Sequence, residues 1–363
     1  MSVWNVVGRL AVVGEESVRD RENIHGGDIY RNPVRLDFSV NTSPLGMPGK
    51  AREALLRSIE DCGHYPDLYA DRLRGAVARQ LDVSENQLLF GNGASELFMG
   101  IVHALRPEKV LLPIPSFYGY RYAAEAACGS ISKLHLQERE DYVPGDDLIK
   151  CLTEDVDLVF LANPNNPTGR CMEPEYLTEV LRTCRERRIY VVLDECFLDF
   201  CIGRKSIVPQ IGQYDRLLVV RAFTKLYAIP GVRLGYLVCS NEALLEKIRR
   251  QLPEWNVSVP AQAAGLGCLE QEDYVQATRA YVAREREYLS ECLKRAGIRV
   301  FESEADFLLI YSRIPLYTML LEKGILIRDC SNFEGLSEGY YRVAVRSHEE
   351  NEELGKAVEK CVL

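Results

Sequence analysis

The chain has 363 residues, of which 47% are hydrophobic and 27% are charged, an ordinary balance for a soluble globular protein. At about 150 residues per domain, this length predicts two domains. The 44 basic and 53 acidic side chains give a net charge of −9, so no overall positive field would hold nucleic acid or an anionic membrane surface. An anionic ligand must therefore be bound by a local pocket.

Membrane insertion, export and metal binding have little support in the sequence. No apolar run approaches the ~18 residues of a membrane span, and residues 1–20 lack the apolar core of a secretion signal. The 12 cysteines include no CxxC pair, and the 5 histidines form no HxxxH or HxH group. We therefore expect a cytoplasmic protein with reduced thiols, no metal site, and no nucleic-acid or membrane partner.

The first part of the chain predicts an arm followed by a large α/β domain. Residues 1–50 contain scattered glycines and prolines, and we interpret them as an arm that packs near a second domain. In residues 51–252, short apolar runs alternate with amphipathic stretches, as in a mostly parallel sheet with helices on both faces. The predicted strands are Gln87–Phe90, Val110–Leu112, Leu158–Ala162, Ile189–Leu193, Leu217–Val220 and Leu234–Val238.

Helices are expected between these strands. Ser95–Leu105 places its apolar side chains on one face, which is typical of a helix packed on a sheet. Pro174–Glu186 begins with a proline, a residue that suits the first helical turn. The helical pattern then breaks at residues 252–256.

Residues 253–363 are predicted to form a smaller α+β domain. From Pro260 onward the sequence predicts one long helix. Strands are predicted at Phe307–Tyr311 and at Tyr341–Val345. The whole chain is thus expected to be an α/β protein with a large and a small domain.

A glycine-rich motif, Gly91-Asn92-Gly93-Ala94-Ser95-Glu96, lies between a predicted strand and a predicted helix. Backbone N–H groups at such a helix start can hold a phosphate, although a tight turn with a Ser95 cap explains the motif equally well. Glu96 stands where a dinucleotide fingerprint has its third glycine, and the next strand ends in Pro113 with no acidic residue for a ribose. This disfavours a nicotinamide-dependent dehydrogenase.

Four further motifs are placed where predicted strands end, which is where α/β sheets bind ligands. They are Asn163-Pro164-Asn165-Asn166-Pro167-Thr168-Gly169, Leu193-Asp194-Glu195, Phe223-Thr224-Lys225 and Arg233-Leu234-Gly235-Tyr236. In this order they resemble the aminotransferase class I/II superfamily, the pyridoxal-phosphate enzymes of fold type I. The resemblance runs from about His25 to the C-terminus and implies pyridoxal 5′-phosphate as the cofactor.

This resemblance implies two catalytic residues. Lys225 matches the lysine that binds the cofactor covalently, and a lysine can attack an aldehyde only when neutral, which burial beside cations such as Arg233 favours. Asp194 matches the aspartate that holds the proton on the pyridine nitrogen. Taken alone, Lys225 could be a surface lysine and Asp194 a helix or turn cap.

The same resemblance implies the remaining cofactor contacts. Asn166 matches the asparagine that hydrogen-bonds the 3′ oxygen, and Phe117 matches the aromatic residue that stacks on the ring, with ordinary core packing as the alternative for Phe117. Tyr65 matches a tyrosine that reaches a phosphate in the neighbouring subunit, which implies a homodimer with shared active sites. The implied phosphate contacts are Gly93, Ala94, Ser95, Thr224 and Arg233.

Two positions depart from the superfamily pattern. Ala222 stands where many relatives have a serine three residues before the lysine, so one hydroxyl contact to the phosphate is missing. Phe197 stands where many aminotransferases have a tyrosine three residues after the aspartate, which removes a hydrogen bond to the 3′ oxygen. Simple packing also explains Phe197.

Finer features resemble the threonine-phosphate decarboxylases of cobalamin synthesis and the related histidinol-phosphate aminotransferases. The segments that carry this likeness are His25-Gly26-Gly27, residues 37–46 (DFSVNTSPLG), 194–200 (DECFLDF), 227–231 (YAIPG) and 341–346 (YRVAVR). The His-Gly-Gly arm and Phe197 favour the decarboxylases. The implied reaction is decarboxylation of L-threonine O-3-phosphate.

The implied substrate is a small phosphorylated amino acid or amine. Arg342 matches an arginine that binds the substrate carboxylate, and Arg328 one that meets the phosphate. Arg346, four residues after Arg342 along the same run, is expected on the same side of the strand. His25 and Asn41 complete the candidate substrate-binding residues.

The sequence leaves the reaction open. Transamination of histidinol phosphate with 2-oxoglutarate would use the same Lys225, Asp194 and Asn166. A remote alternative is a non-catalytic regulator that binds pyridoxal phosphate, but such proteins normally carry a DNA-binding module, and no helix-turn-helix segment or basic patch precedes this fold.

Overall fold

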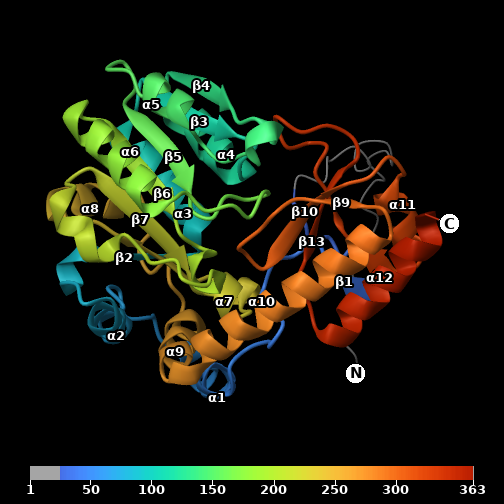
Figure 1. Cartoon of the computed structure of the whole chain (residues 1–363). Helices are drawn as coiled ribbons and strands as arrows, with labels where there is room; N and C mark the ends of the chain where they lie inside the picture. Colours follow the sequence, from blue (N-terminus) through green and yellow to red (C-terminus); the bar gives the residue numbers. More distant parts are fainter. Residues whose placement is uncertain (1–24, 363) are drawn as a thin grey trace, which may run out of the picture.

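A computed structural model describes residues 25–362, so predictions that fall on residues 1–24 lie outside the described residues. Its largest sheet has seven strands in the order β2-β8-β7-β6-β5-β3-β4 (Figure 1). β8 is antiparallel to both neighbours and the other pairs are parallel, so the predicted mostly parallel sheet is confirmed. The strands are β2 (Leu88–Gly91), β3 (Lys109–Ile114), β4 (Ser130–His135), β5 (Leu158–Ala162), β6 (Tyr190–Asp194), β7 (Leu217–Ala222) and β8 (Gly235–Val238).

Helices cover both faces of this sheet. Successive side chains along its central strands point alternately into two apolar cores, one on each face. In β6, Val191 and Leu193 point into one core and Val192 into the other. One core is closed by α3 (Ala94–Leu105), α4 (Tyr118–Ala127) and α8 (Glu242–Arg249). The other is closed by α2 (Asp71–Leu81), α5 (Asp146–Cys151) and α6 (Pro174–Glu186).

The six strands predicted for the large sheet are all present, with ends that differ by a few residues. β4 is missing from the prediction because its sequence, Ser-Ile-Ser-Lys-Leu-His, is polar and its side chains are partly exposed at the sheet edge. Short helical segments complete this part of the chain: η1 (Glu60–Gly63), η2 (Glu85–Gln87), η3 (Glu138–Glu140), η4 (Leu198–Phe200), η5 (Val208–Gln213), α7 (Phe223–Leu226) and η6 (Pro230–Val232).

A second, four-stranded antiparallel sheet has the order β12-β13-β10-β9. Its apolar core is shared with helices that follow it and precede it in the chain. Figure 1 shows these helices beside the sheet, on the side of the C-terminus. The elements are β9 (Arg299–Val300), β10 (Phe307–Tyr311), β12 (Arg328–Asp329), β13 (Tyr340–Ala344), α10 (Glu272–Arg295), α11 (Leu316–Leu321) and α12 (His348–Val362). β1 (Leu36–Asp37) pairs in parallel with β11 (Ile325–Leu326). The predicted domain boundaries at residues 50 and 252 stay predictions.

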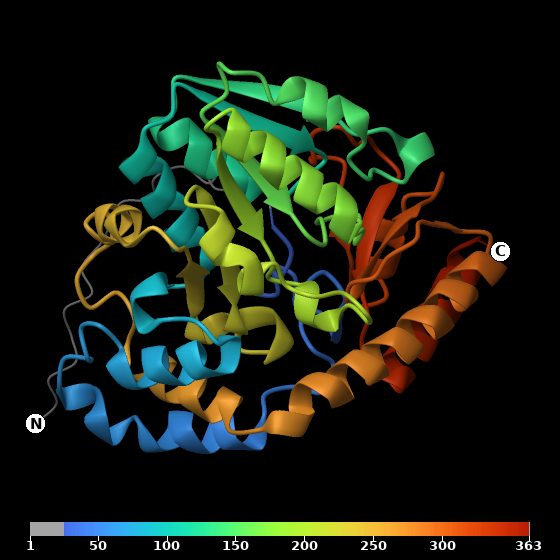
Figure 2. The same cartoon turned by 60° about the vertical axis from the view of Figure 1, so that its left-hand side comes forward.

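The single long helix predicted from Pro260 is wrong. The structure has two helices, α9 (Val259–Leu269) and α10, and Gln271 between them has the non-helical angles φ −110° and ψ 81°. α9 packs so closely on α1 (Gly49–Arg57) that a Cβ on Gly267 would lie 2.5 Å from the carbonyl oxygen of Lys50. The interruption lets α10 leave this contact and run to the second sheet (Figure 2).

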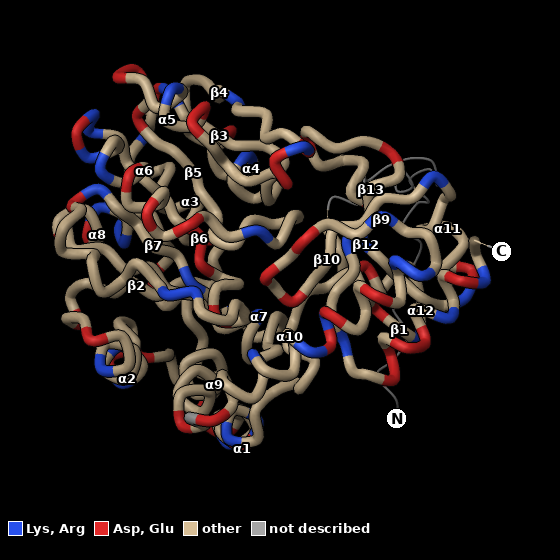
Figure 3. The backbone as a smooth tube through the Cα atoms, viewed as in Figure 1, with Lys and Arg blue, Asp and Glu red and all other residues tan. Residues whose placement is uncertain are grey.

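Acidic and basic positions are interspersed over the described chain, as Figure 3 shows. Within residues 25–362, no helix is long and apolar enough to cross a membrane. In the same residues, no group of three or more His, Cys, Asp or Glu side chains is arranged to hold a metal ion.

Candidate active site

The predicted strand-end residues meet at one edge of the large sheet. Asp194 is the last residue of β6, and Lys225 lies in α7, directly after β7. Parallel register places Asp194 beside Ala162 of β5 and Val220 of β7. The loop that carries Asn166 starts immediately after Ala162, so this edge brings the three candidate residues together.

Asp194 is a buried carboxylate held by neutral donors. The Tyr120 hydroxyl donates to its Oδ2 at 2.6 Å, and the Cys196 N–H donates to its Oδ1 at 2.8 Å. Burial raises the pKa of Asp194, because charge is unfavourable where water is absent. Because both donors are neutral, the carboxylate of Asp194 still lacks a positively charged partner, which a cationic ring N–H would supply. Tyr120 is absent from the sequence prediction, since a tyrosine in an amphipathic helix indicates only packing.

Lys225 is surrounded by aromatic rings and cations. Its Nζ lies 5.6 Å from the ring centre of Phe197, which packs edge-on against Phe307 at 5.2 Å. Burial is the largest cause that lowers the pKa of Lys225, and the charge of Arg342 is the next. The sequence indicates Arg233 as a cation that would lower this pKa. Arg233 does lower the pKa of Lys225, but less than Arg342 does.

Arg342 is fixed by two acceptors. Its guanidinium donates to Asn166 Oδ1 at 2.5 Å and to the Ser39 carbonyl oxygen at 2.8 Å. The Asn166 loop is itself braced, since the Asn165 side chain donates to the Pro115 carbonyl at 3.0 Å. A predicted cofactor contact and a predicted substrate contact therefore touch each other directly.

The start of α3 forms a cradle with Arg233. Gly93 has φ +80°, and a Cβ at this position would lie 2.5 Å from Nη2 of Arg233. Ala94 and Ser95 form the first turn of α3, whose N–H groups favour an anion. Thr224 is buried one residue before Lys225. Arg233 stands just before β8, so the expectation that its motif follows a strand is wrong, although Arg233 still reaches the cradle.

The second sheet contributes the candidate substrate residues. Arg328 of β12 lies directly opposite Arg342 of β13, and both are buried, with exposed fractions of 5% and 7%. Arg328 lines a cavity of about 320 Å³ with His25 and Ser39, and it donates to Asn332 Oδ1 at 2.7 Å. The pKa of His25 is lowered by burial first and by the charge of Arg328 next.

Phe117 and Asn41 lie beside this region. The ring of Phe117 is 5.9 Å from the ring of His25, which connects the predicted cofactor side to the substrate side. Asn41 is buried, and its Oδ1 has no hydrogen-bond partner among residues 25–362. That oxygen is therefore available to a donor on a ligand.

Two candidate residues lie apart from this cluster. β13 ends at Ala344, so the prediction that Arg346 lies on the same side of this strand as Arg342 is wrong; the Arg346 guanidinium instead pairs with Glu350 of α12 at 3.5 Å. Tyr65 is 80% exposed, and its ring packs on Trp255 at 4.8 Å. A substrate role for Arg346 and a partner-subunit role for Tyr65 stay predictions.

The sequence profile of the family described as aminotransferase class I and II matches residues 34–360. The chain belongs to this family. A threonine-phosphate decarboxylase of Salmonella typhimurium is 37% identical over 344 residues, which cover 91% of this chain and 94% of that protein. The residues matched by the family profile therefore include both sheets and the buried arginines Arg328 and Arg342.

Solved structures of other proteins share the fold. The histidinol-phosphate aminotransferase of Clostridium acetobutylicum has a TM-score of 0.84 and 32% identity, over 90% of this chain and 99% of the other. The histidinol-phosphate aminotransferase of Sinorhizobium meliloti, solved in complex with pyridoxal-5′-phosphate, has a TM-score of 0.83 and 19% identity, over 92% and 93%. The predicted class of fold is confirmed by these likenesses.

Proposed function

We propose that this chain uses pyridoxal 5′-phosphate to decarboxylate L-threonine O-3-phosphate. When bound, the cofactor supplies an electron-withdrawing ring that stabilises the electron pair of a bond broken at the substrate carbon. Three features fit it: the buried Asp194 suits a pyridinium N–H, the cradle of Gly93 and Arg233 suits a phosphate, and Lys225 has a lowered pKa.

The pairing of Arg328 with Arg342 carries the proposal for the substrate. Arg328 and Arg342 occupy paired positions on neighbouring strands and are both buried, so this part of the site is strongly cationic and favours an anionic ligand. Burial lowers the pKa of Arg342 to about 10, and the Arg328 charge acts in the same direction. Threonine phosphate has a carboxylate and a phosphate on one small molecule, which matches two arginines. Histidinol phosphate has only the phosphate, although glutamate would bring two carboxylates.

The chain's own side chains have separate tasks in this reaction. Arg342, held by Asn166 and Ser39, fixes the substrate carboxylate in one orientation. Arg328 holds the phosphate. When the carbon–carbon bond breaks, carbon dioxide leaves, the electron pair stays behind, and a proton from the Lys225 ammonium forms the new C–H bond.

One experiment separates the two candidate reactions. The holoenzyme is incubated with threonine phosphate or with histidinol phosphate, with and without 2-oxoglutarate, and carbon dioxide and glutamate are measured. We expect carbon dioxide from threonine phosphate, independent of the keto acid. Glutamate formation without carbon dioxide would instead assign the chain to transamination.

Arg328→Ala is expected to weaken binding of threonine phosphate far more than binding of threonine. A charge-assisted phosphate contact contributes ~1.5–3 kcal/mol, so KM for the phosphorylated substrate should rise about tenfold to a hundredfold. The matched control is Arg313→Ala, because Arg313 is exposed. Equal losses for threonine phosphate and threonine would remove Arg328 from the phosphate site.

We also propose that the active form is a homodimer. Large apolar side chains are exposed in the segment of the chain that leads to Tyr65, among them Leu56 at 64% and Ile59 at 61%, which is typical of a surface covered by a second copy. Sedimentation at micromolar concentration should give twice the mass of one chain. A fully active monomer would rule the dimer out. The cytoplasmic location expected from the sequence stays a prediction.

A further inference from the structure

Ser39 is a buried serine whose carbonyl and hydroxyl groups make contacts in different parts of the candidate site. Its exposed fraction is 1%, and its carbonyl oxygen accepts a hydrogen bond from the Arg342 guanidinium at 2.8 Å. Its hydroxyl oxygen instead accepts a hydrogen bond from the Gly27 N–H at 2.7 Å. Ser39 also lines the cavity of about 320 Å³ to which His25 and Arg328 contribute. None of the roles assigned above uses the Ser39 hydroxyl.

Backbone hydrogen bonds fix Ser39 relative to both buried arginines. The N–H of the preceding residue, Phe38, donates to the Leu326 carbonyl oxygen at 2.7 Å, and Leu326 lies two residues before Arg328. The carbonyl oxygen of Phe38 accepts from the Ala344 N–H at 2.8 Å, and Ala344 lies two residues after the other arginine. A change at the Ser39 side chain therefore leaves this backbone frame in place.

Asp37 sets the direction of the Ser39 hydroxyl. The hydroxyl donates to Asp37 Oδ1 at 2.6 Å, and the Ser39 N–H donates to the same oxygen at 2.8 Å. With its hydrogen used in this way, the hydroxyl oxygen keeps its lone pairs for an incoming donor, which is the Gly27 N–H. Because Asp37 belongs to β1, the hydroxyl is tied to the paired strands β1 and β11.

Residues 25–27 form a short strap that lies against Ser39. A Cβ on Gly26 would stand 2.2 Å from the Ser39 carbonyl oxygen, so a side chain there would collide with it. Gly27 has φ +85°, a conformation that favours glycine. The strap begins with His25, whose ring lies 5.9 Å from the ring of Phe117. The Ser39 hydroxyl therefore fastens the strap two residues away from His25.

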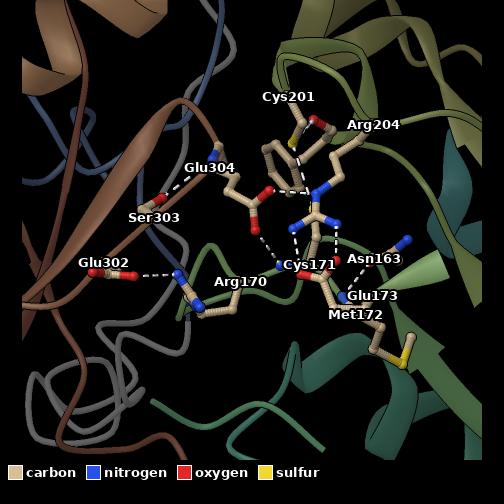
Figure 4. A network of polar contacts seen from close by, with 12 residues as sticks. Asn163, Arg170, Cys171, Met172, Glu173, Cys201, Arg204, Glu302, Ser303 and Glu304 are labelled. Carbon is tan, nitrogen blue, oxygen red and sulfur yellow. Dashed lines mark hydrogen bonds and ion pairs between the residues drawn. The ribbon is translucent and has the colours of Figure 1, made fainter. Parts of the chain in front are cut away.

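The second acceptor of Arg342 is held by contacts outside the strap. This acceptor, Asn166, stands on the loop that leads to Cys171. Figure 4 shows the Glu304 carboxylate between Arg204, at 2.5 Å, and the backbone N–H of Cys171, at 3.1 Å. Arg342 therefore has an acceptor whose position does not depend on the strap.

We propose that Ser39 is a positioning residue that serves the two anions of the substrate through two different groups. Its carbonyl oxygen orients Arg342 for the carboxylate, and its hydroxyl holds the strap so that His25 closes the phosphate side of the cavity beside Arg328. This inference rests on the proposed function, which places a carboxylate and a phosphate on one small molecule. The Ser39 hydroxyl thereby favours phosphorylated substrates, whereas the carboxylate contact forms without it.

The test uses two molecules that each carry one of the two anions. Aminopropanol phosphate has the phosphate without the carboxylate, and L-threonine has the carboxylate without the phosphate. Their dissociation constants are measured on full-length holoenzyme from the change in its visible absorption. In Ser39→Ala the constant for aminopropanol phosphate should rise about threefold to tenfold, as expected when the hydrogen bonds of one hydroxyl are lost, while the constant for threonine stays within about twofold. Equal changes for both molecules, or no change for either, would overturn the proposal.

Ser337→Ala is the matched control, because Ser337 is an exposed serine beside the second sheet. Neither dissociation constant should change in this variant. Circular dichroism and thermal unfolding show whether both serine variants are folded.

Gly26→Ala tests the strap while leaving the Ser39 hydroxyl in the chain. The added Cβ would meet the Ser39 carbonyl oxygen at 2.2 Å, so the strap must shift. Binding of aminopropanol phosphate should weaken as in Ser39→Ala. Gly145→Ala is the control for this change, because a Cβ on Gly145 would meet nothing within 4 Å. Unchanged binding of aminopropanol phosphate in Gly26→Ala would contradict the proposal.

Hydrogen exchange in the wild-type holoenzyme gives a readout that needs no variant and no turnover. Aminopropanol phosphate should slow exchange of the backbone amides in residues 25–31, because its phosphate holds His25 at the cavity, whereas L-threonine should not. Equal protection by both molecules, or by neither, would overturn the role of the strap.

Failure of this inference and failure of the proposed function give different results. Wild-type holoenzyme that releases no carbon dioxide from threonine phosphate would defeat the proposed decarboxylation. Carbon dioxide release by the wild type, together with unchanged binding of aminopropanol phosphate in Ser39→Ala and Gly26→Ala, would defeat only the role of Ser39.

Discussion

Replacing Lys225 by alanine is expected to abolish covalent cofactor binding and turnover together. Lys225 is the amine at the end of β7, and burial together with Arg342 lowers its pKa toward the neutral form that attacks an aldehyde. The visible absorption band that a lysine-bound cofactor gives should disappear. Turnover should fall by several orders of magnitude, because attachment and proton delivery are lost at once.

The matched control for this variant is Lys205→Ala, since Lys205 is exposed and lies in the loop after η4. Absorption spectra of the two variants after saturation with pyridoxal phosphate and removal of the excess give the comparison. A visible band that survives in Lys225→Ala, with unchanged position, would show that another amine holds the cofactor.

Asp194→Asn is expected to leave the fold intact and to reduce turnover strongly. The amide keeps an oxygen for the Tyr120 hydroxyl or the Cys196 N–H but carries no charge for a pyridinium group. Loss of one partner of a buried charge pair costs about 3–5 kcal/mol, which corresponds to a fall in turnover of about 10²- to 10⁴-fold.

Tyr120→Phe tests the hydrogen bond that Tyr120 donates to Asp194 separately from the charge of Asp194. This change removes one hydrogen bond to a charged group, worth about 1.5–3 kcal/mol, and keeps the carboxylate. Turnover should therefore fall less than in Asp194→Asn, while circular dichroism and thermal unfolding show that both variants are folded. Near-normal turnover in Asp194→Asn would exclude the proposed role of Asp194.

The strand-end chemistry could be predicted because it depends on local sequence order. Apolar runs identify the buried strands of a parallel sheet, and their carboxyl ends necessarily meet at one edge, so the sequence alone places Asp194 and Lys225 near each other. The prediction of one helix from Pro260 fails for the opposite reason. Gln271 leaves the helical region directly after α9, which packs closely on α1, and the apolar pattern alone does not mark this break.

Residues whose role depends on tertiary contacts cannot be identified from local patterns. Tyr120 looks like a packing residue in an amphipathic helix, yet its hydroxyl meets Asp194. Asp306 precedes an apolar strand, where a carboxylate is ordinarily a solvated end residue, and only tertiary structure shows that it is fully buried. Arg346 shows the converse error, because strand alternation does not continue to a residue two positions past the end of β13.

The most direct test of the account follows the carbon that loses the carboxylate. Holoenzyme is given L-threonine O-3-phosphate in deuterium oxide without any keto acid, and carbon dioxide, aminopropanol phosphate and its deuterium content are measured together. The account predicts one carbon dioxide per aminopropanol phosphate, with one deuterium bound at the former carboxyl-bearing carbon. Consumption of threonine phosphate with the carboxylate retained, and an amino group transferred instead, would contradict it.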